Sequence, residues 1–381
     1  MKKILIIHNK YLNLGGEDLV VLNETKLLSK NYNVENLYFH NTKKLEISDY
    51  WSLLFGRNRK SEKIIRDKIK EFNPNIVYFH NLWYKINTKT VLKACKNIEQ
   101  IFIKQHNLRH ECIQGMHYRN ESLCHSCQTK GILQGIRKKC YHDSYLKSFL
   151  MTLFSRRYLK ILRNNKIKIL TFSNFHIDRL VTNKVDNDKI FKLNNYLEKT
   201  PTPEIKINLP QKYICFVGRA SKEKGVHIIT EAFINSNLKD TKLLIVGNIS
   251  ADIDTAKYSK YAEIEFKNQL KNEEVRFLMS KSRAVIMGSI AYEGHPVTLS
   301  EAIISNSVLI YPSFSGLDEL MPLDYDYSYF HNDIEDLTRV MNLLNDEKTY
   351  SKNKSSLKVF KEKKYSEDLF FEQFQLALDC K

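Results

Sequence analysis

Short apolar runs alternate with longer amphipathic stretches along the whole chain. In the first half the apolar runs are 3–9, 33–40, 75–81, 100–107 and 167–173, and they are rich in Ile, Val, Phe and Tyr. In the second half they are 212–218, 241–247, 261–267, 283–289 and 307–313. Apolar strands separated by helical patterns are typical of βαβ units with a parallel sheet. The pattern therefore predicts an α/β protein with two doubly wound, Rossmann-like domains.

A proline-rich stretch divides these two series of strands. The segment 198–210, "EKTPTPEIKINLP", holds three prolines and little apolar surface, which is typical of a linker. We expect an N-terminal domain over 1–200 and a C-terminal domain over 201–365. The amphipathic helix predicted in 366–381 is expected to pack back on the first domain. Ligands of such sheets bind at the carboxyl ends of the strands, so we expect one cleft between facing domains.

The net charge of +17 is unevenly distributed. Residues 1–200 hold 37 Lys and Arg against 17 Asp and Glu, whereas residues 201–381 hold 23 against 26. The segment 130–168 has eleven basic residues, one acid and interleaved Leu, Phe, Ile and Tyr. It fits an anionic membrane surface, or else a solvated helix face beside a buried one. No zinc-finger, RNA-recognition or basic-zipper signature is present, which argues against nucleic acid as a partner.

The beginning of the chain, "MKKILIIHNK", has only four apolar residues in a row and no small-residue cleavage site. We interpret it as a first strand and not as a signal peptide. No run of 18 apolar residues occurs in the sequence, so none predicts a membrane span. These features favour a cytoplasmic protein, peripheral on the inner face of the membrane.

The segment 215–233, "CFVGRASKEKGVHIITEAF", predicts a phosphate site in the second domain. A strand ends at Gly218, and Arg219 and Lys224 follow at the start of a helix. A helix N-terminus offers unpaired N–H groups, and the two cations would add charge for a diphosphate. A plain strand–loop–helix turn with surface basic residues is the alternative.

The segment 293–303, "EGHPVTLSEAI", predicts a turn followed by a helix, with an acid on each side. N–H groups from the stretch Gly294, His295, Pro296, Val297 and Thr298 would hold phosphate oxygens. An acid beside a phosphate is unfavourable, so Glu293 and Glu301 are better explained as acceptors for hydroxyl groups on either side. A nucleotide sugar has this layout. Two unrelated surface acids are the alternative interpretation.

Together these elements resemble glycosyltransferase family 4, the retaining enzymes of the GT-B fold. In the first half, "NLGGEDLVV" (13–21) resembles the family's Gly-Gly-Glu loop, and "VYFHNLW" (77–83) and "KQHNLRHEC" (104–112) resemble strand ends of a bacterial polysaccharide-assembly branch. The resemblance covers nearly the whole chain. It implies transfer of a sugar from a nucleoside diphosphate to a saccharide or lipid-diphosphate-linked acceptor, with no catalytic metal.

The resemblance also implies roles for individual residues. Arg219 and Lys224 would neutralise the donor diphosphate, Glu301 would bind the ribose and Glu293 the donor sugar. Gly15 and Gly16 would let the first-domain loop approach the donor. His106 would orient sugar and acceptor; His8, His80 and His106 each fall at a predicted strand end. A nucleotide-sugar epimerase of the same fold, and a non-enzymatic binder of anionic membrane or polymer, are the alternative functions.

Four cysteines form a separate cluster in the sequence. Cys112, Cys124, Cys127 and Cys140 lie within 29 residues in a basic, histidine-rich loop. In a chain without an export signal, this spacing fits a structural zinc site, with nearby His110, His117, His125 and His142 as substitute ligands. Free cysteines in a flexible loop are the alternative.

Overall fold

The computed structural model describes residues 1–12, 15–42, 44–199, 204–205 and 207–380. The predicted linker 198–210 therefore lies partly outside the described residues. The chain forms two compact units. The first comprises Met1–Arg119, Cys124–Tyr196 and Glu367–Lys381, and the second comprises Asn120–Leu123 and Leu197–Ser366.

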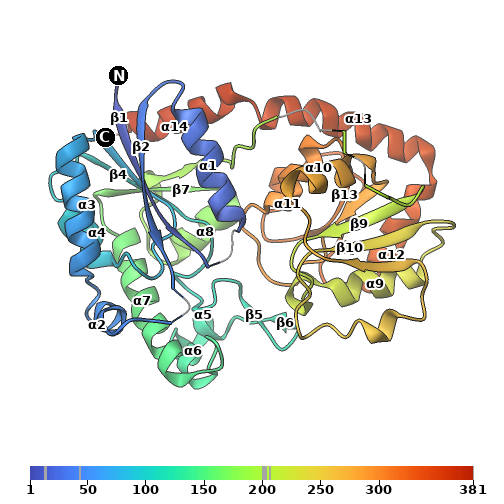
Figure 1. The fold of residues 1–381 in the computed structure, drawn as a ribbon, viewed down its shortest axis with the longest axis horizontal. Helices are drawn as coiled ribbons and strands as arrows, with labels where there is room; N and C mark the ends of the chain where they lie inside the picture. Colours follow the sequence, from blue (N-terminus) through green and yellow to red (C-terminus); the bar gives the residue numbers. More distant parts are fainter. Residues whose placement is uncertain (13–14, 43, 200–203, 206, 381) are drawn as a thin grey trace. The chain divides into compact units, whose positions relative to one another are not determined.

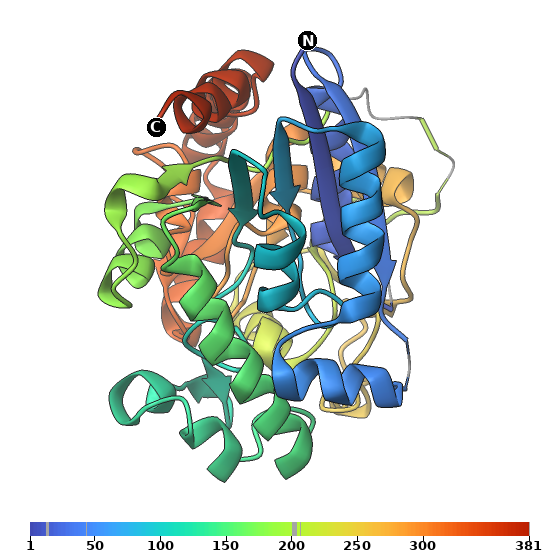
Figure 2. The same cartoon turned by 90° about the vertical axis from the view of Figure 1, so that its left-hand side faces the viewer.

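A six-stranded parallel sheet in the order β2-β1-β3-β4-β7-β8 forms the centre of the first unit (Figures 1 and 2). Its strands are β1 (Lys3–Lys10), β2 (Asn33–His40), β3 (Ile76–Phe79), β4 (Gln100–Lys104), β7 (Ile167–Thr171) and β8 (Ile190–Lys192). The helices are α1 (Gly16–Leu28), α2 (Ile47–Phe55), α3 (Arg59–Phe72), α4 (Thr88–Ala94), α5 (Ser126–Lys130), α6 (Gln134–Arg137), α7 (Tyr145–Leu162), α8 (Asn174–Thr182) and α14 (Glu367–Asp379). Two short strands, β5 (Tyr118–Arg119) of the first unit and β6 (Ser122–Leu123) of the second, follow β4 in the chain.

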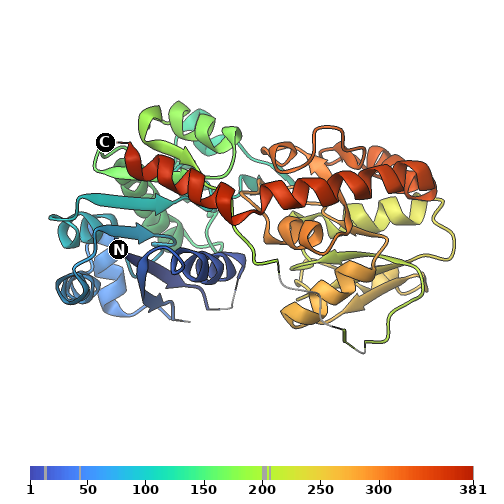
Figure 3. The same cartoon turned by 90° about the horizontal axis from the view of Figure 1, so that it is seen from above.

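Alternate residues of each strand face two separate apolar cores. Leu5 and Ile7 of β1 belong to the core that includes side chains of α3, α4 and α7, whereas Ile4 and Ile6 belong to the core on the other side. Helix α14 completes that second core with Phe370 and Phe374, and it runs along the first unit's sheet in Figure 3. A strand that is covered on both faces has a continuous apolar sequence, which is why β1 could be predicted as a strand.

The second unit is built around another six-stranded parallel sheet, in the order β11-β10-β9-β12-β13-β14. Its strands are β9 (Tyr213–Val217), β10 (Lys242–Val246), β11 (Ile264–Lys267), β12 (Ala284–Ile286), β13 (Val308–Ser313) and β14 (Ser328–Phe330). The helices are α9 (Val226–Asn235), α10 (Asn272–Lys281), α11 (Val297–Ile304), α12 (Ile334–Asn342) and α13 (Glu347–Lys364). The predicted fold class, two doubly wound parallel sheets, is confirmed.

The edge strands β8 and β14 differ from the pattern expected along the chain, because they have three residues each and were not predicted. The basic segment 130–168 contains α6, which ends at Arg137, and α7, which begins at Tyr145. Within the described residues, the structure contains no helix with the length and apolar character needed to cross a bilayer.

Candidate functional site

In the second unit, the carboxyl ends of β9 and β10 meet at two glycines. Gly247 has φ 141°, and a Cβ there would lie 1.9 Å from the carbonyl oxygen of Gly218. Beyond this contact, the N–H of Ala220 donates to the carbonyl of Asn248 at 2.9 Å. Only residues without a side chain allow the two loops to come this close. The predicted site residue Gly218 thus starts a loop fixed against its neighbour.

Gly225 closes the turn that carries Lys224. Its φ is 67°, and a Cβ there would lie 1.8 Å from the carbonyl oxygen of Gly288. Lys222–Lys224 form one turn of 3-10 helix, and α9 begins only at Val226. The prediction that Arg219 and Lys224 start the helix is therefore wrong. Both precede it, since the left-handed glycine separates the basic turn from α9.

Lys224 contacts the first glutamate of the other motif. Its Nζ lies 2.5 Å from Oε1 of Glu293, which also accepts a hydrogen bond from the hydroxyl of Ser289 at 2.5 Å. The backbone supports this meeting, because the N–H of Ile290 donates to the carbonyl of Glu223 at 2.9 Å. The two motifs, about 70 positions apart in the sequence, therefore form one polar cluster.

Arg219 belongs to the same loop but points elsewhere. Its guanidinium pairs with the carboxylate of Glu223, four residues on, and more than half of its side chain is exposed. An exposed ion pair of this kind contributes little stability, so the guanidinium can exchange partners at low cost. It remains available to an anion near the end of β9.

Helix α11 brings the second glutamate toward the end of β9. Pro296 precedes its first residue, no side chain caps the helix, and the hydroxyl of Thr298 donates to the carbonyl of Val217 at 3.3 Å. Glu301 lies one turn after Thr298 on the same face. His295 is buried, with Nε2 3.0 Å from the hydroxyl of Ser300.

Burial controls the ionisation of Glu301. Loss of solvent raises the pKa of its carboxyl from the ordinary 4.5 to about 7, and the nearby Arg276 opposes this shift. A carboxyl with such a pKa is poised between its two protonation states near neutral pH. The environment of Glu301 therefore differs from that of Glu293, which holds its lysine partner 2.5 Å away.

The first unit places the predicted loop glycines at the beginning of α1. Gly16 is the first helical residue, and Gly15 precedes it with an extended backbone, φ −125°. Asp18 accepts from the N–H of Gly15 at 2.8 Å and contacts Nε2 of His8 at 3.0 Å. The N–H of Asn81 donates to Nδ1 of His8 at 3.4 Å, so Nε2 carries the proton and donates to Asp18. His8 therefore fixes the start of α1.

The other two histidines are in contact at the ends of β3 and β4. Nδ1 of His80 lies 3.0 Å from Nε2 of His106, and their rings stack. Behind them, the buried carboxylate of Glu24 accepts from the hydroxyl of Tyr78 at 2.8 Å and pairs with Lys104. Burial lowers the pKa of His80 well below its ordinary value, and the neighbouring His106 adds to the effect. His80 is thus neutral at pH 7, and it holds the ring of His106.

A small cavity opens beside these histidines. Its volume is about 20 Å³, enough for one water-sized group. Its lining includes Glu17, His80, Lys104, His106, Arg109 and Tyr158. Oε2 of Glu17 and Nε of Arg109 are buried there without a hydrogen-bond partner. An unpaired acceptor and an unpaired donor beside the same cavity suit a hydroxyl group, which both donates and accepts.

Glu17 and Arg109 were given no role in the sequence analysis. Both lie in segments that carry the family resemblance, the Gly-Gly-Glu loop and the stretch 104–112. In the structure Oε1 of Glu17 accepts from the amide of Asn107 at 3.3 Å, and burial raises the pKa of its carboxyl while Arg109 opposes the shift. The signal available was the "NLR" stretch after His106, which puts Asn107 and Arg109 at the same strand end.

The four cysteines lie around one loop system in the first unit. The amide of Gln114 donates to the carbonyl of Cys140 at 2.7 Å, and the N–H of Cys124 donates to the carbonyl of His117 at 2.6 Å. Burial raises the pKa of the Cys127 thiol to about 12, and the three other thiols add to the shift. Among the described residues, however, no three Cys, His, Asp or Glu side chains are arranged to hold one metal ion. Zinc binding, which would require the sulfurs to move closer together, stays a prediction.

Comparison with known proteins gives matches to structures and to one family. A search of curated proteins found no match. The fold of the whole chain is similar to that of Anabaena HepE solved with UDP and glucose, with 12% identity, 99% of each chain covered and a TM-score of 0.66. It is also similar to the lipopolysaccharide outer core galactosyltransferase WaaB (17%, 99% of each chain, 0.62) and to a glycosyltransferase from Rickettsia africae ESF-5 (16%, 100% of each chain, 0.65).

These identities establish the fold alone, which is that of GT-B glycosyltransferases. Residues 199–358 match the family "Glycosyl transferases group 1". This match covers the segment that carries Arg219, Lys224, Glu293 and Glu301. The chain thus has a GT-B fold, and its second unit resembles the group 1 glycosyl transferases.

Proposed function

We propose that the protein is a retaining glycosyltransferase that moves a sugar from a nucleoside diphosphate to an acceptor hydroxyl. The observation that carries the proposal is the meeting of Lys224 and Glu293 at 2.5 Å, next to the uncapped N-terminus of α11. The same edge of the sheet thus carries a cation (Lys224), the N-terminus of α11, and a carboxylate (Glu293) that can accept hydrogen bonds from hydroxyl groups. The match of residues 199–358 and the UDP complex of HepE support a nucleotide-sugar donor.

In this proposal the second unit binds the donor. Lys224 would leave Glu293 for the diphosphate, joined by Arg219 and the N–H groups of Val297 and Thr298. Glu293 would then accept from hydroxyl groups of the sugar, and Glu301 from those of the ribose. Because these cations are fixed in the protein, we expect no catalytic metal to be needed.

The reaction would proceed on one face of the sugar. The bond between the anomeric carbon and the diphosphate oxygen breaks, and a bond from the same carbon to the acceptor oxygen forms. The acceptor proton passes to the departing diphosphate. Arg219, Lys224 and the start of α11 would stabilise the growing negative charge, so catalysis would rest on electrostatic preorganisation and positioning.

The cavity of the first unit is the proposed place for the acceptor hydroxyl. Glu17 and Arg109 each present an unpaired atom there, and His106 lines the same space. His106 would orient the hydroxyl, and its contact with neutral His80 would keep the imidazole in one position. A saccharide, free or carried by a lipid diphosphate, is the acceptor class that the resemblance to the family 4 polysaccharide-assembly branch suggests.

The test is donor turnover by purified variants. Lys224→Ala and Glu293→Ala should each abolish transfer while the melting temperature changes little, since the pair is partly exposed. Lys239→Ala, an exposed lysine of the same unit, is the matched control. Turnover like that of the wild type in either site variant would contradict the donor assignment.

The donor and the reaction class can be separated in two further measurements. A thermal-shift screen over UDP-, GDP- and dTDP-sugars identifies the nucleotide, because a bound ligand raises the melting temperature. Turnover with and without acceptor then distinguishes the functions. Acceptor-dependent release of the nucleotide supports a transferase, and isomerisation of the sugar without acceptor indicates an epimerase. If the protein catalyses neither reaction, it is a binding protein.

A further inference from the structure

Helix α2 exposes four of its apolar side chains, although Leu53 is buried in the core. Asp49 and Ser52 are buried, with 1% and 2% of their surface exposed. Trp51 and Phe55 are exposed by 57% and 59%, and their rings stack on each other. Ile47 and Leu54 continue the exposed stripe. A surface helix of a water-soluble domain normally turns its apolar side chains toward the core. Exposing this apolar stripe to water therefore costs free energy.

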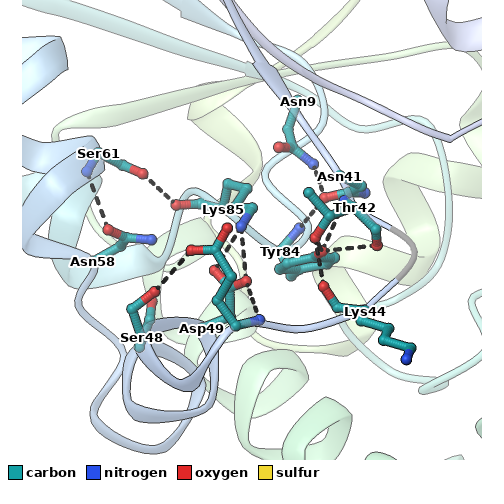
Figure 4. Close-up of polar contacts among 12 residues, drawn as sticks. Asn9, Asn41, Thr42, Lys44, Ser48, Asp49, Asn58, Ser61, Tyr84 and Lys85 are labelled. Atoms are coloured by element: carbon teal, nitrogen blue, oxygen red, sulfur yellow. Dashed lines mark hydrogen bonds and ion pairs between the residues drawn. The ribbon is translucent and has the colours of Figure 1, made fainter.

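The buried side of α2 is anchored by specific polar contacts. Nζ of Lys85 lies 2.9 Å and 2.7 Å from the two oxygens of Asp49 (Figure 4). The amide of Asn87 donates to the hydroxyl of Ser52 at 2.6 Å, and the guanidinium of Arg157 donates to carbonyl oxygens at the end of the helix. Rotating α2 to hide Trp51 would leave these buried groups without partners, which is costly. The outward apolar face is therefore built into the fold.

Other exposed apolar side chains lie at the same end of the first unit. Tyr145, Leu146 and Phe149 are exposed on the first turns of α7, and Leu133 is exposed just before α6. Helix α2 contacts α7, and Figures 1 and 2 both place α2, α6 and the beginning of α7 at one end of the unit. We call these eight residues the α2–α7 face: Ile47, Trp51, Leu54, Phe55, Leu133, Tyr145, Leu146 and Phe149.

Positive charge accompanies this apolar surface. Arg59 and Lys60 follow α2 and are exposed, and Lys147 and Arg156 are exposed on α7. Within 44–60 and 130–168 the exposed acids are Glu46 and Asp143. Aromatic and aliphatic side chains among exposed cations match a bilayer interface, where rings lie at headgroup depth and Lys and Arg meet anionic phosphates.

We propose that the α2–α7 face inserts into the surface of an anionic phospholipid membrane. The surrounding cations favour an anionic partner, and apolar side chains standing out from helices match a lipid surface better than a groove on a protein. The proposal does not rest on glycosyl transfer, because vesicle binding is measured without substrate. Helix α7 would link membrane binding to the proposed acceptor site. Its exposed side carries Phe149, while its buried Phe154 and Tyr158 line the cavity of the first unit.

The first test is flotation of the full-length protein with vesicles of phosphatidylglycerol and phosphatidylcholine mixed in equal parts, against phosphatidylcholine alone. We expect binding to the anionic vesicles only. Trp51→Ser with Phe55→Ser should weaken binding roughly tenfold for each ring removed. Phe330→Ser is the matched control, since Phe330 is also exposed, at 72%, in the second unit. Unchanged binding of the double variant, or equal loss in the control, overturns the proposal.

Fluorescence gives a second readout without any substitution. The chain has two tryptophans, and Trp83 is already buried with its indole bonded to Tyr141 at 2.9 Å. A blue shift on adding anionic vesicles, with quenching by lipids brominated in the acyl chain, would therefore report entry of Trp51. Binding without shift or quenching would mean that the protein attaches by charge alone or by another face, and the proposal would be wrong.

Discussion

Replacing Glu301 with glutamine should stabilise the second unit at alkaline pH and leave it unchanged in acid. The carboxyl is protonated in both the folded and the unfolded chain below its ordinary pKa of 4.5, so it then costs no stability. Between pH 4.5 and the folded pKa of about 7, the unfolded chain releases the proton while the folded chain keeps it. Stability therefore falls as the pH rises through this window and stays low above it.

The size of the effect follows from the shift. A change from 4.5 to about 7 corresponds to up to about 3.5 kcal/mol of folding free energy, at about 1.4 kcal/mol for each pH unit. In a unit of this size that corresponds to a change of roughly 7 to 14 °C in melting temperature. A glutamine side chain cannot ionise, so the Glu301→Gln variant should gain this amount at pH 8.5 and nothing at pH 4.

The assay is thermal unfolding at intervals from pH 4 to pH 8.5, with the difference between variant and wild type plotted against pH. Taking this difference cancels the contributions to stability of all titratable groups that the two proteins share. Glu273→Gln, an exposed glutamate of α10, is the control for removing a carboxylate from the surface of the same unit. A flat line for Glu301→Gln, a curve no different from that of Glu273→Gln, or a variant less stable than the wild type at pH 8.5 would refute the argument that burial raises the pKa of Glu301.

Two further predictions concern a glycine and the cysteines. Gly225→Ala should destabilise the second unit by about 3 kcal/mol or more, measured by denaturant unfolding, because its Cβ would overlap the carbonyl of Gly288. Gly56→Ala is the comparison, because its φ of 73° and ψ of 19° are close to those of Gly225 while its Cβ would meet only the movable side chain of Arg157, so it should cost about 1 to 2 kcal/mol; equal losses would show that backbone conformation alone matters. For the cysteines, elemental analysis of protein purified without chelator should find one equivalent of zinc, and Cys127→Ser should lower it. Substoichiometric metal with four titratable thiols would contradict zinc binding.

The central strands could be predicted because each of them is a short, continuous apolar run in the sequence. The predicted run 33–40 has the bounds of β2, and the run 3–9 differs from β1 by one residue. The edge strand β14 has three residues and follows no long apolar run, so periodicity gives no signal for it. Short edge strands depend on the neighbour they pair with, which the sequence does not display.

The site residues could be predicted where they belong to a sequence motif, but not where their role depends on being buried. Lys224 and Glu293 were expected from turn-and-helix patterns. By contrast, Glu24 and Lys104 look like ordinary charged residues of a helix and a strand, yet both are fully buried and paired with each other. Asp49 and Ser52 are a similar case, since polar positions in a helix normally indicate its solvent side and both of these are buried. Contacts between distant segments decide these cases, and a local pattern cannot report them.

The first unit is assembled from both ends of the chain, and this has a consequence for biosynthesis. Phe370, Phe374 and Leu378 of α14 fill a core made mainly by residues 4–196. Domains usually fold in the order in which they leave the ribosome. Here one face of the first unit's sheet stays partly uncovered until α14 has been translated, whereas the second unit can fold before that. A truncation just before α14 should therefore destabilise the first unit more than the second.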